Sequence, residues 1–123
     1  MQSLHFQERS LKPYAEPVSI GELKEGEVYF TIQFAGSDRD GLFPIMETLV
    51  FVGSNLDEDD VDRRVYFQDI ESYQAGVRYR TSTADDGAVF YAQDPQYLNH
   101  IFEYENALNE LLKCSLRRTG VRG

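Results

Sequence analysis

Residues 43–53 read Phe-Pro-Ile-Met-Glu-Thr-Leu-Val-Phe-Val-Gly and form the most apolar stretch of the chain. The stretch is rich in β-branched and aromatic residues, and Pro44 and Gly53 bound it. It is too short for a buried helix, and the residues that bound it are typical of turns. We therefore expect it to be the central strand of a sheet, covered on both faces, with the rest of the chain packed around it.

The segment before this stretch has the pattern of a half-buried strand. Apolar side chains alternate with polar ones from residue 28 to residue 34, and residues typical of turns fill positions 35–41. This pattern predicts an antiparallel hairpin between residues 28–34 and the central strand. Further short strands are predicted at residues 65–70, 77–80, 88–92 and 98–102.

One helix is predicted, over residues 105–118. The apolar stripe of this helix, at a spacing of about 3.6 residues, consists of Tyr104, Leu108, Leu111, Leu112 and Ser115. Acidic residues in its early part and basic residues at its end match the helix dipole, and Gly120 ends it.

Six short strands and one terminal helix predict an α+β, strand-rich fold. We expect a mainly antiparallel sheet, curled or forming a partial small barrel, with the amphipathic C-terminal helix packed on it. A split α+β sheet is the alternative. At 123 residues the chain is long enough to bury a core of its own. Residues 1–17, with two X-Pro steps and no clear period, are expected to form an extended arm, and residues 18–123 a single globular domain.

The net charge of −9 at pH 7 argues against nucleic acid or an anionic membrane as a partner, because both bind clustered Lys and Arg. A basic protein partner is compatible with this charge, and so is a role in solubility alone. The first twenty residues lack the apolar core of a signal peptide, and the lone Cys114 is typical of a reducing compartment. We therefore expect a cytoplasmic protein; the sequence favours no oligomeric state.

The negative charge is concentrated between residues 57 and 62. Acids at this density repel one another unless a cation or a basic partner lies nearby. Tyrosine beside carboxylate is also typical of a protein-binding face. The predicted partner-binding residues are Asp57, Glu58, Asp59, Asp60, Asp62, Tyr66 and Tyr73. The alternative is a solvated loop that Arg63 and Arg64 partly neutralise.

Glu47 is the one acid of the central stretch. In a strand it shares a face with Leu49 and Phe51, which makes it a candidate pocket acid together with neighbouring tyrosines. The alternative places it at the exposed end of the strand. The spacing of Asp38, Asp40 and Glu47 resembles part of a calcium-binding loop, but an ordinary acidic hairpin is favoured because Pro44 falls where a ligand is usual.

These features favour a non-enzymatic, acidic protein-binding module, of an inhibitor, immunity or adaptor kind, that engages a basic protein. We expect no catalytic residue, no metal site and no cofactor, because the sequence carries no nucleophile-base pattern, no Cys/His cluster and no phosphate-binding glycine loop. The alternative is a small-molecule binding or catalytic domain whose pocket contains Glu47 and tyrosines.

Overall fold

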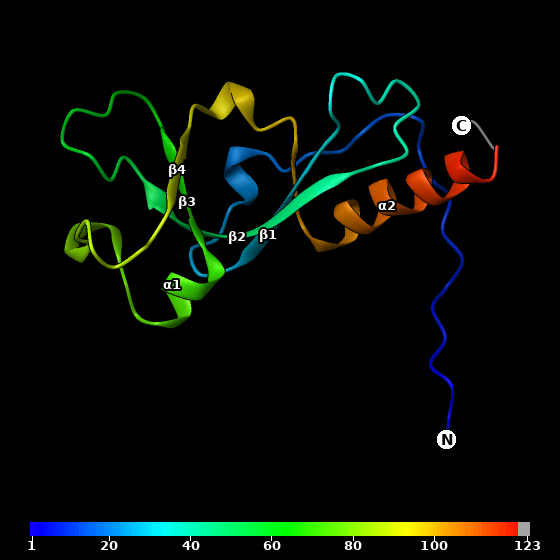
Figure 1. The fold of residues 1–123 in the computed structure, drawn as a ribbon, viewed down its shortest axis with the longest axis horizontal. Helices are drawn as coiled ribbons and strands as arrows, with labels where there is room; N and C mark the ends of the chain where they lie inside the picture. The colour runs from blue at the N-terminus through cyan, green and yellow to red at the C-terminus, as the bar shows by residue number, and fades with distance from the viewer. Residues whose placement is uncertain (121–123) are drawn as a thin grey trace.

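The computed structural model describes residues 1–120, in which one antiparallel sheet carries a C-terminal helix (Figure 1). The strands are β1 (Val28–Gln33), β2 (Ile45–Ser54), β3 (Val65–Asp69), β4 (Phe90–Gln93) and β5 (Ile101–Phe102). The helices are α1 (Ile70–Gln74) and α2 (Tyr104–Arg118), with short 3-10 turns at Ile20–Glu22, Tyr79–Thr81 and Pro95–Tyr97. The predicted α+β class is confirmed.

β2 is the central strand of the sheet, whose order is β4-β3-β2-β1-β5. The predicted hairpin is confirmed as well, because β1 and β2 pair antiparallel from Val28 opposite Val50 to Gln33 opposite Ile45. β2 begins directly after Pro44, which cannot donate a hydrogen bond to a neighbouring strand. The sequence therefore locates both the strand and its place in the sheet.

The main core lies on one face of the sheet. Phe67 of β3 is fully buried there, and its ring contacts those of Tyr29 and Phe51, with centroids 6.2 and 5.7 Å away. The cluster consists of Val18, Tyr29, Leu49, Phe51, Val65, Phe67, Leu98 and Ile101. Val18 and Leu98 come from outside the sheet, so segments before β1 and before β5 cover this face.

Helix α2 packs on the other face, over β1 and β5. Ile32, Phe102 and Ala107 form a smaller core there, with Phe30 packed against it. The helix starts one residue before the predicted position and ends where predicted. The Glu103 carboxylate caps its start by accepting hydrogen bonds from the first backbone N–H groups.

The number of strands differs from the prediction. Residues 1–120 contain five strands instead of six, because residues 77–80 run into a 3-10 turn, Tyr79–Thr81, and do not join the sheet. The sheet is open, with β4 and β5 at its edges. The alternation of Val77 and Tyr79 is typical of a strand, but Tyr79 does not pair with a strand. Its ring contacts the rings of Tyr66 and Phe90.

Two predicted burial patterns are also wrong. The first half of β2, residues 45–48, is exposed, and only the second half is covered by the core. On α2 the buried residues are Ala107 and Cys114, while Tyr104 and Leu112 are exposed. The face of α2 that packs on the sheet therefore contains Ala107 and Cys114 and differs from the predicted stripe.

Residues 1–19 contain no helix or strand. The chain passes beside α2 and then beside β5, where the Val18 backbone N–H donates a hydrogen bond to the Ile101 carbonyl (2.8 Å). The beginning of the chain projects away from the sheet and helix (Figure 1). In the part of the chain that the structure describes, no helix has the length and apolarity needed to span a bilayer.

Candidate functional site

The acidic segment forms the loop between β2 and β3, and one of its acids is buried. The Asp60 side chain is only 4% exposed. Its carboxylate accepts hydrogen bonds from the Tyr66 hydroxyl (2.5 Å) and the Asp57 backbone N–H (3.0 Å). Tyr66 belongs to β3 and is buried in the sheet. Asp60 therefore ties the loop to the core.

This contact shifts the titration of both groups. The hydrogen bond from Tyr66 lowers the pKa of Asp60 below its ordinary value against the opposing effect of burial, with help from the Asp57 N–H and from Arg64. Burial raises the pKa of Tyr66, and the hydrogen bond to Asp60 raises it further. At neutral pH the pair is thus an ionised carboxylate held by a neutral phenol.

The other four acids of the segment are exposed: Asp57, Glu58, Asp59 and Asp62. Hydrogen bonds within the loop fix its backbone. The Asp57 carboxylate accepts one from the Asp59 N–H (3.0 Å), and the Asn55 and Arg64 backbones are joined across the base of the loop (2.8 Å). Asn55 and Asp62 adopt φ values of 53° and 60°, which Asn and Asp tolerate better than most residues. The exposed carboxylates are therefore presented by a hydrogen-bonded frame.

Two shallow depressions flank the loop. Tyr79 and Arg80 line the first, opposite Asp57, to which the Tyr79 hydroxyl donates a hydrogen bond of 3.3 Å. Asp94 and Pro95 line the second, beside Val61 and Asp62. We call this part of the surface the acidic end and define it as Asp57, Glu58, Asp59, Asp62, Tyr79 and Asp94.

The predicted acids lie together, but the predicted tyrosines do not join them at the surface. The ring of Tyr66 is buried, and only its hydroxyl reaches the loop. Tyr73 belongs to α1, which lies apart from the loop in Figure 1, and the Arg78 guanidinium stacks 4.0 Å from the centre of its ring. Tyr79 is the tyrosine of the acidic end. The pattern of residues 77–80 predicts a strand for Tyr79, whereas it lies in a 3-10 turn beside the acidic loop.

Glu47 lies at the exposed end of β2. Its carboxylate accepts a hydrogen bond from the hydroxyl of Tyr91 in β4 (2.9 Å). This bond raises the pKa of Tyr91, and partial burial adds to the shift. Glu47 does share a face with Leu49 and Phe51, as strand alternation predicts, but it lies in the exposed half of the strand. The candidate pocket acid is therefore a surface carboxylate paired with a tyrosine.

Asp38 closes the loop of the β1–β2 hairpin. Its carboxylate accepts hydrogen bonds from the backbone N–H groups of Phe43 (2.9 Å) and Leu42 (3.1 Å), which lower its pKa. Within residues 1–120, no group of three or more His, Cys, Asp or Glu side chains is arranged to hold a metal ion. Asp38 thus takes part in the turn of the hairpin through its carboxylate.

Comparison with models of protein families, with curated proteins and with solved structures gives no match to this chain.

Proposed function

We propose that the chain is a non-enzymatic protein-binding module that engages a basic protein through its acidic end. The observation that supports this is the division of roles among the carboxylates. Asp60 is buried and hydrogen-bonded, and the frame that it anchors holds Asp57, Glu58 and Asp59 outward. A fixed loop loses less conformational freedom on binding than a disordered acidic segment does, so more of the contact energy remains as affinity.

The distribution of charge over the molecule also supports this proposal. The basic residues Arg117 and Arg118 lie in the last turn of α2, at the opposite end of the molecule from the acidic loop (Figure 1). Such a separation orients an approaching basic surface toward the acidic end. Arg63 and Arg64 offset two of the loop acids, and the Arg64 guanidinium lies 4.0 Å from the buried Asp60.

The first test is affinity capture from the source cell with two baits, the wild-type chain and the variant Asp57→Lys with Asp59→Lys. A basic protein should bind the wild-type chain at low salt, leave it at high salt, and fail to bind the variant. The matched control carries the same change of net charge on exposed acids elsewhere, Glu71→Lys with Asp85→Lys. Equal capture by both charge-reversed variants would show that net charge, and not the acidic end, attracts the partner.

Association kinetics with the captured protein provide the second test. The field of the acidic end extends over about 10 Å at 0.1 M salt and speeds encounter, whereas exposed charges add little to the finished contact. Reversal of Asp57 and Asp59 should slow association and flatten its salt dependence, with the dissociation rate nearly unchanged. Tyr79→Ala should instead speed dissociation. If the reversed variant associates as fast as the wild-type chain at low salt, the acidic loop contributes to solubility and not to partner binding.

A second candidate function is favoured by the hydrogen bond between Tyr91 and Glu47. A phenol and a carboxylate at an uncovered part of a sheet can orient a small polar molecule by hydrogen bonding. If this is the function, a nuclear magnetic resonance screen of small polar compounds should find a ligand that Glu47→Gln no longer binds. The same substitution should leave the salt-dependent capture of a basic protein unchanged, so the two candidates are distinguishable.

A further inference from the structure

The two edges of the sheet differ in what covers them. At the β5 edge, the Ile101 carbonyl accepts a hydrogen bond from the Val18 N–H (2.8 Å), and the Ile101 N–H donates one to the Leu98 carbonyl (3.1 Å). The outer backbone groups of Ile101 are therefore already used. β5 is also only two residues long, which leaves little backbone for a further strand.

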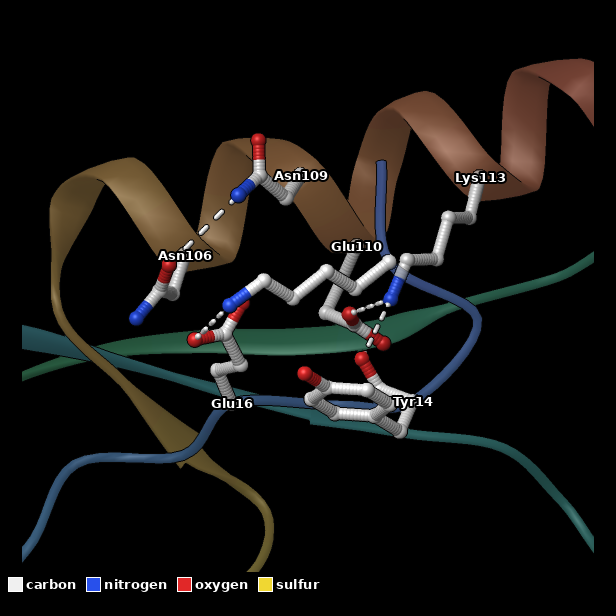
Figure 2. A pocket seen from close by; sticks show the side chains of 7 residues that line it. Tyr14, Glu16, Asn106, Asn109, Glu110 and Lys113 are labelled. Atoms are coloured by element: carbon white, nitrogen blue, oxygen red, sulfur yellow. Dashed lines mark hydrogen bonds and ion pairs between the residues drawn. The ribbon is translucent and has the colours of Figure 1, made fainter. Parts of the chain in front are cut away.

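The arm that supplies Val18 is held in place by polar contacts with α2. The Arg9 guanidinium donates hydrogen bonds to two side chains of the helix (2.8 and 3.1 Å). Figure 2 shows a second contact, in which the Lys113 ammonium donates hydrogen bonds to the Tyr14 carbonyl (2.9 Å) and the Glu110 carboxylate (2.7 Å). The β5 edge is thus closed by a segment of the chain itself.

The edge of β4 has no such cover, because no strand within residues 1–120 pairs with its outer side. The Asp69 N–H donates a hydrogen bond to the Val89 carbonyl (3.2 Å), and the residues that bond across an antiparallel pair alternate along each strand. Tyr91 therefore turns its backbone groups toward β3. The N–H and C=O groups of Phe90 and Ala92 point the other way, out of the edge of the sheet. An extended chain laid along β4 is the kind of partner that can bond to these groups.

The charges around this edge favour a basic chain. Residues 81–99, which contain β4, carry no Lys or Arg and three acids, Asp85, Asp86 and Asp94. Glu47 adds a carboxylate beside the strand, because it accepts the hydrogen bond of the Tyr91 hydroxyl (2.9 Å). Lys or Arg side chains of an added chain would therefore meet carboxylates and no competing base in this segment.

The edge of β4 is also continuous with the acidic end. Asp94 follows β4 directly, and it lines a depression together with Asp62 of the acidic loop. The ring of Tyr79 packs against that of Phe90, with the ring centroids 5.3 Å apart. β4 and the acidic loop lie at the same end of the molecule (Figure 1). A chain bound along β4 would thus reach residues of the acidic end.

We propose that the basic protein bound by the acidic end adds an extended segment rich in Lys or Arg to the free edge of β4, as a further strand of the sheet. Backbone hydrogen bonds to Phe90 and Ala92 hold this segment, and the carboxylates around the strand select its charge. The inference rests on the proposed function, because it takes the partner to be basic, and it names the part of that partner that binds.

Nuclear magnetic resonance titration with two synthetic peptides tests the proposal. The first peptide is Lys-Val-Lys-Val-Lys-Val, blocked at both ends, and the second has Glu in place of each Lys. The basic peptide should shift the amide signals of residues 90–93 saturably and slow the hydrogen exchange of the Phe90 and Ala92 amides. The acidic peptide should do neither. No saturable change with the basic peptide, equal binding of both peptides, or a response centred away from β4 would overturn the proposal.

Two alanine-to-proline variants separate strand addition from attraction by charge alone. Ala92→Pro removes an N–H that points away from β3, and edge strands tolerate Pro at such positions. This variant should bind the basic peptide at least about tenfold more weakly, because a donor is lost and the ring stands where the added chain would pack. The control Ala84→Pro lies in the turn that the Asp86 N–H and the Thr83 carbonyl close (3.3 Å), where Pro is common, so it should bind like the wild-type chain. Wild-type affinity of a folded Ala92→Pro variant would overturn the proposal, and hydrogen exchange in the wild-type chain decides the matter if that variant does not fold.

The proposed function and this inference fail in different experiments. If Ala92→Pro captures a basic protein as the wild-type chain does, while Asp57→Lys with Asp59→Lys does not, the acidic end binds its partner without strand addition. Only the inference about β4 is then wrong. If the acidic end captures no basic protein, the proposed function is wrong and the inference about β4 is wrong with it.

Discussion

Asp60 and Tyr66 are six residues apart in the chain, and their hydrogen bond joins the acidic loop to β3. Because the folded state lowers the pKa of Asp60, this carboxylate stabilises the fold above its unfolded pKa of about 4. That contribution is lost as the pH falls through the lowered pKa of the folded state. The pKa of Asp38 is lowered too, by the backbone N–H groups of Phe43 and Leu42, so acid weakens both loops.

Tyr66→Phe should destabilise the chain at pH 7 because it removes the hydroxyl that holds the ionised Asp60. The difference in free energy of unfolding between variant and wild type should be largest near neutral pH. It should shrink as the pH falls through the lowered pKa of Asp60 in the folded wild-type protein, because Asp60 is then protonated in both proteins. Urea denaturation at several pH values measures it, with Tyr97→Phe at an exposed tyrosine as the control. A difference that does not change with pH would contradict this account of Asp60.

Gly53 has a backbone conformation that other residues rarely adopt, with φ of 137°. A Cβ at this position would lie 3.0 Å from a Glu25 carboxylate oxygen and 3.1 Å from the Leu56 side chain. Gly53→Ala should therefore lower the free energy of unfolding by about 1–3 kcal/mol. Gly36→Ala is the matched control, because a Cβ there meets no atom within 4 Å. Equal stabilities of the two variants would show that the strand tolerates a side chain at position 53.

Among the elements, those with strong local signals could be predicted from the sequence. β2 is marked by β-branched and aromatic residues between Pro44 and Gly53, and α2 by its charge gradient and Gly120. The arrangement of the faces could not be predicted, because it depends on segments that come together from distant parts of the chain. Nothing local to residues 45–48 indicates that this half of β2 stays uncovered.

The candidate site could likewise be predicted only where its residues are close together in the sequence. The acids of the loop are adjacent in sequence, so the acidic end could be predicted as a cluster. The contact of Tyr79 with Asp57 joins residues 22 apart, and that of Tyr91 with Glu47 joins residues 44 apart. Such contacts depend on how loops and strands pack together, which alternation along one segment does not report.

Two isoleucines in strands test the difference between covered and uncovered parts of the sheet. Ile101 of β5 is 2% exposed and Ile45 of β2 is 58% exposed. Ile101→Ala should cost about 2–5 kcal/mol of unfolding free energy because it leaves a cavity in the main core. Ile45→Ala should change it by no more than about 0.5 kcal/mol. Chemical denaturation measures both, and a comparable loss at Ile45 would mean that a segment covers this end of β2.

For the whole molecule, the acidic loop and the last turn of α2, which carries Arg117 and Arg118, lie at opposite ends, so charge of opposite sign gathers at the two ends (Figure 1).

The position of β1 in the sheet has a consequence for biosynthesis. β1 pairs with β2, its neighbour in the chain, but its other edge pairs only with β5, where Phe30 lies opposite Phe102. While the chain leaves the ribosome, the hairpin forms first, and one edge of β1 stays open until residues 101–118 have emerged. An open edge with apolar Ile32 beside it is a template for wrong strand pairing. The nascent chain should therefore need chaperone protection until residues 101–118 have emerged, and ribosome-bound chains stalled before residue 101 should bind chaperones more strongly than the released protein.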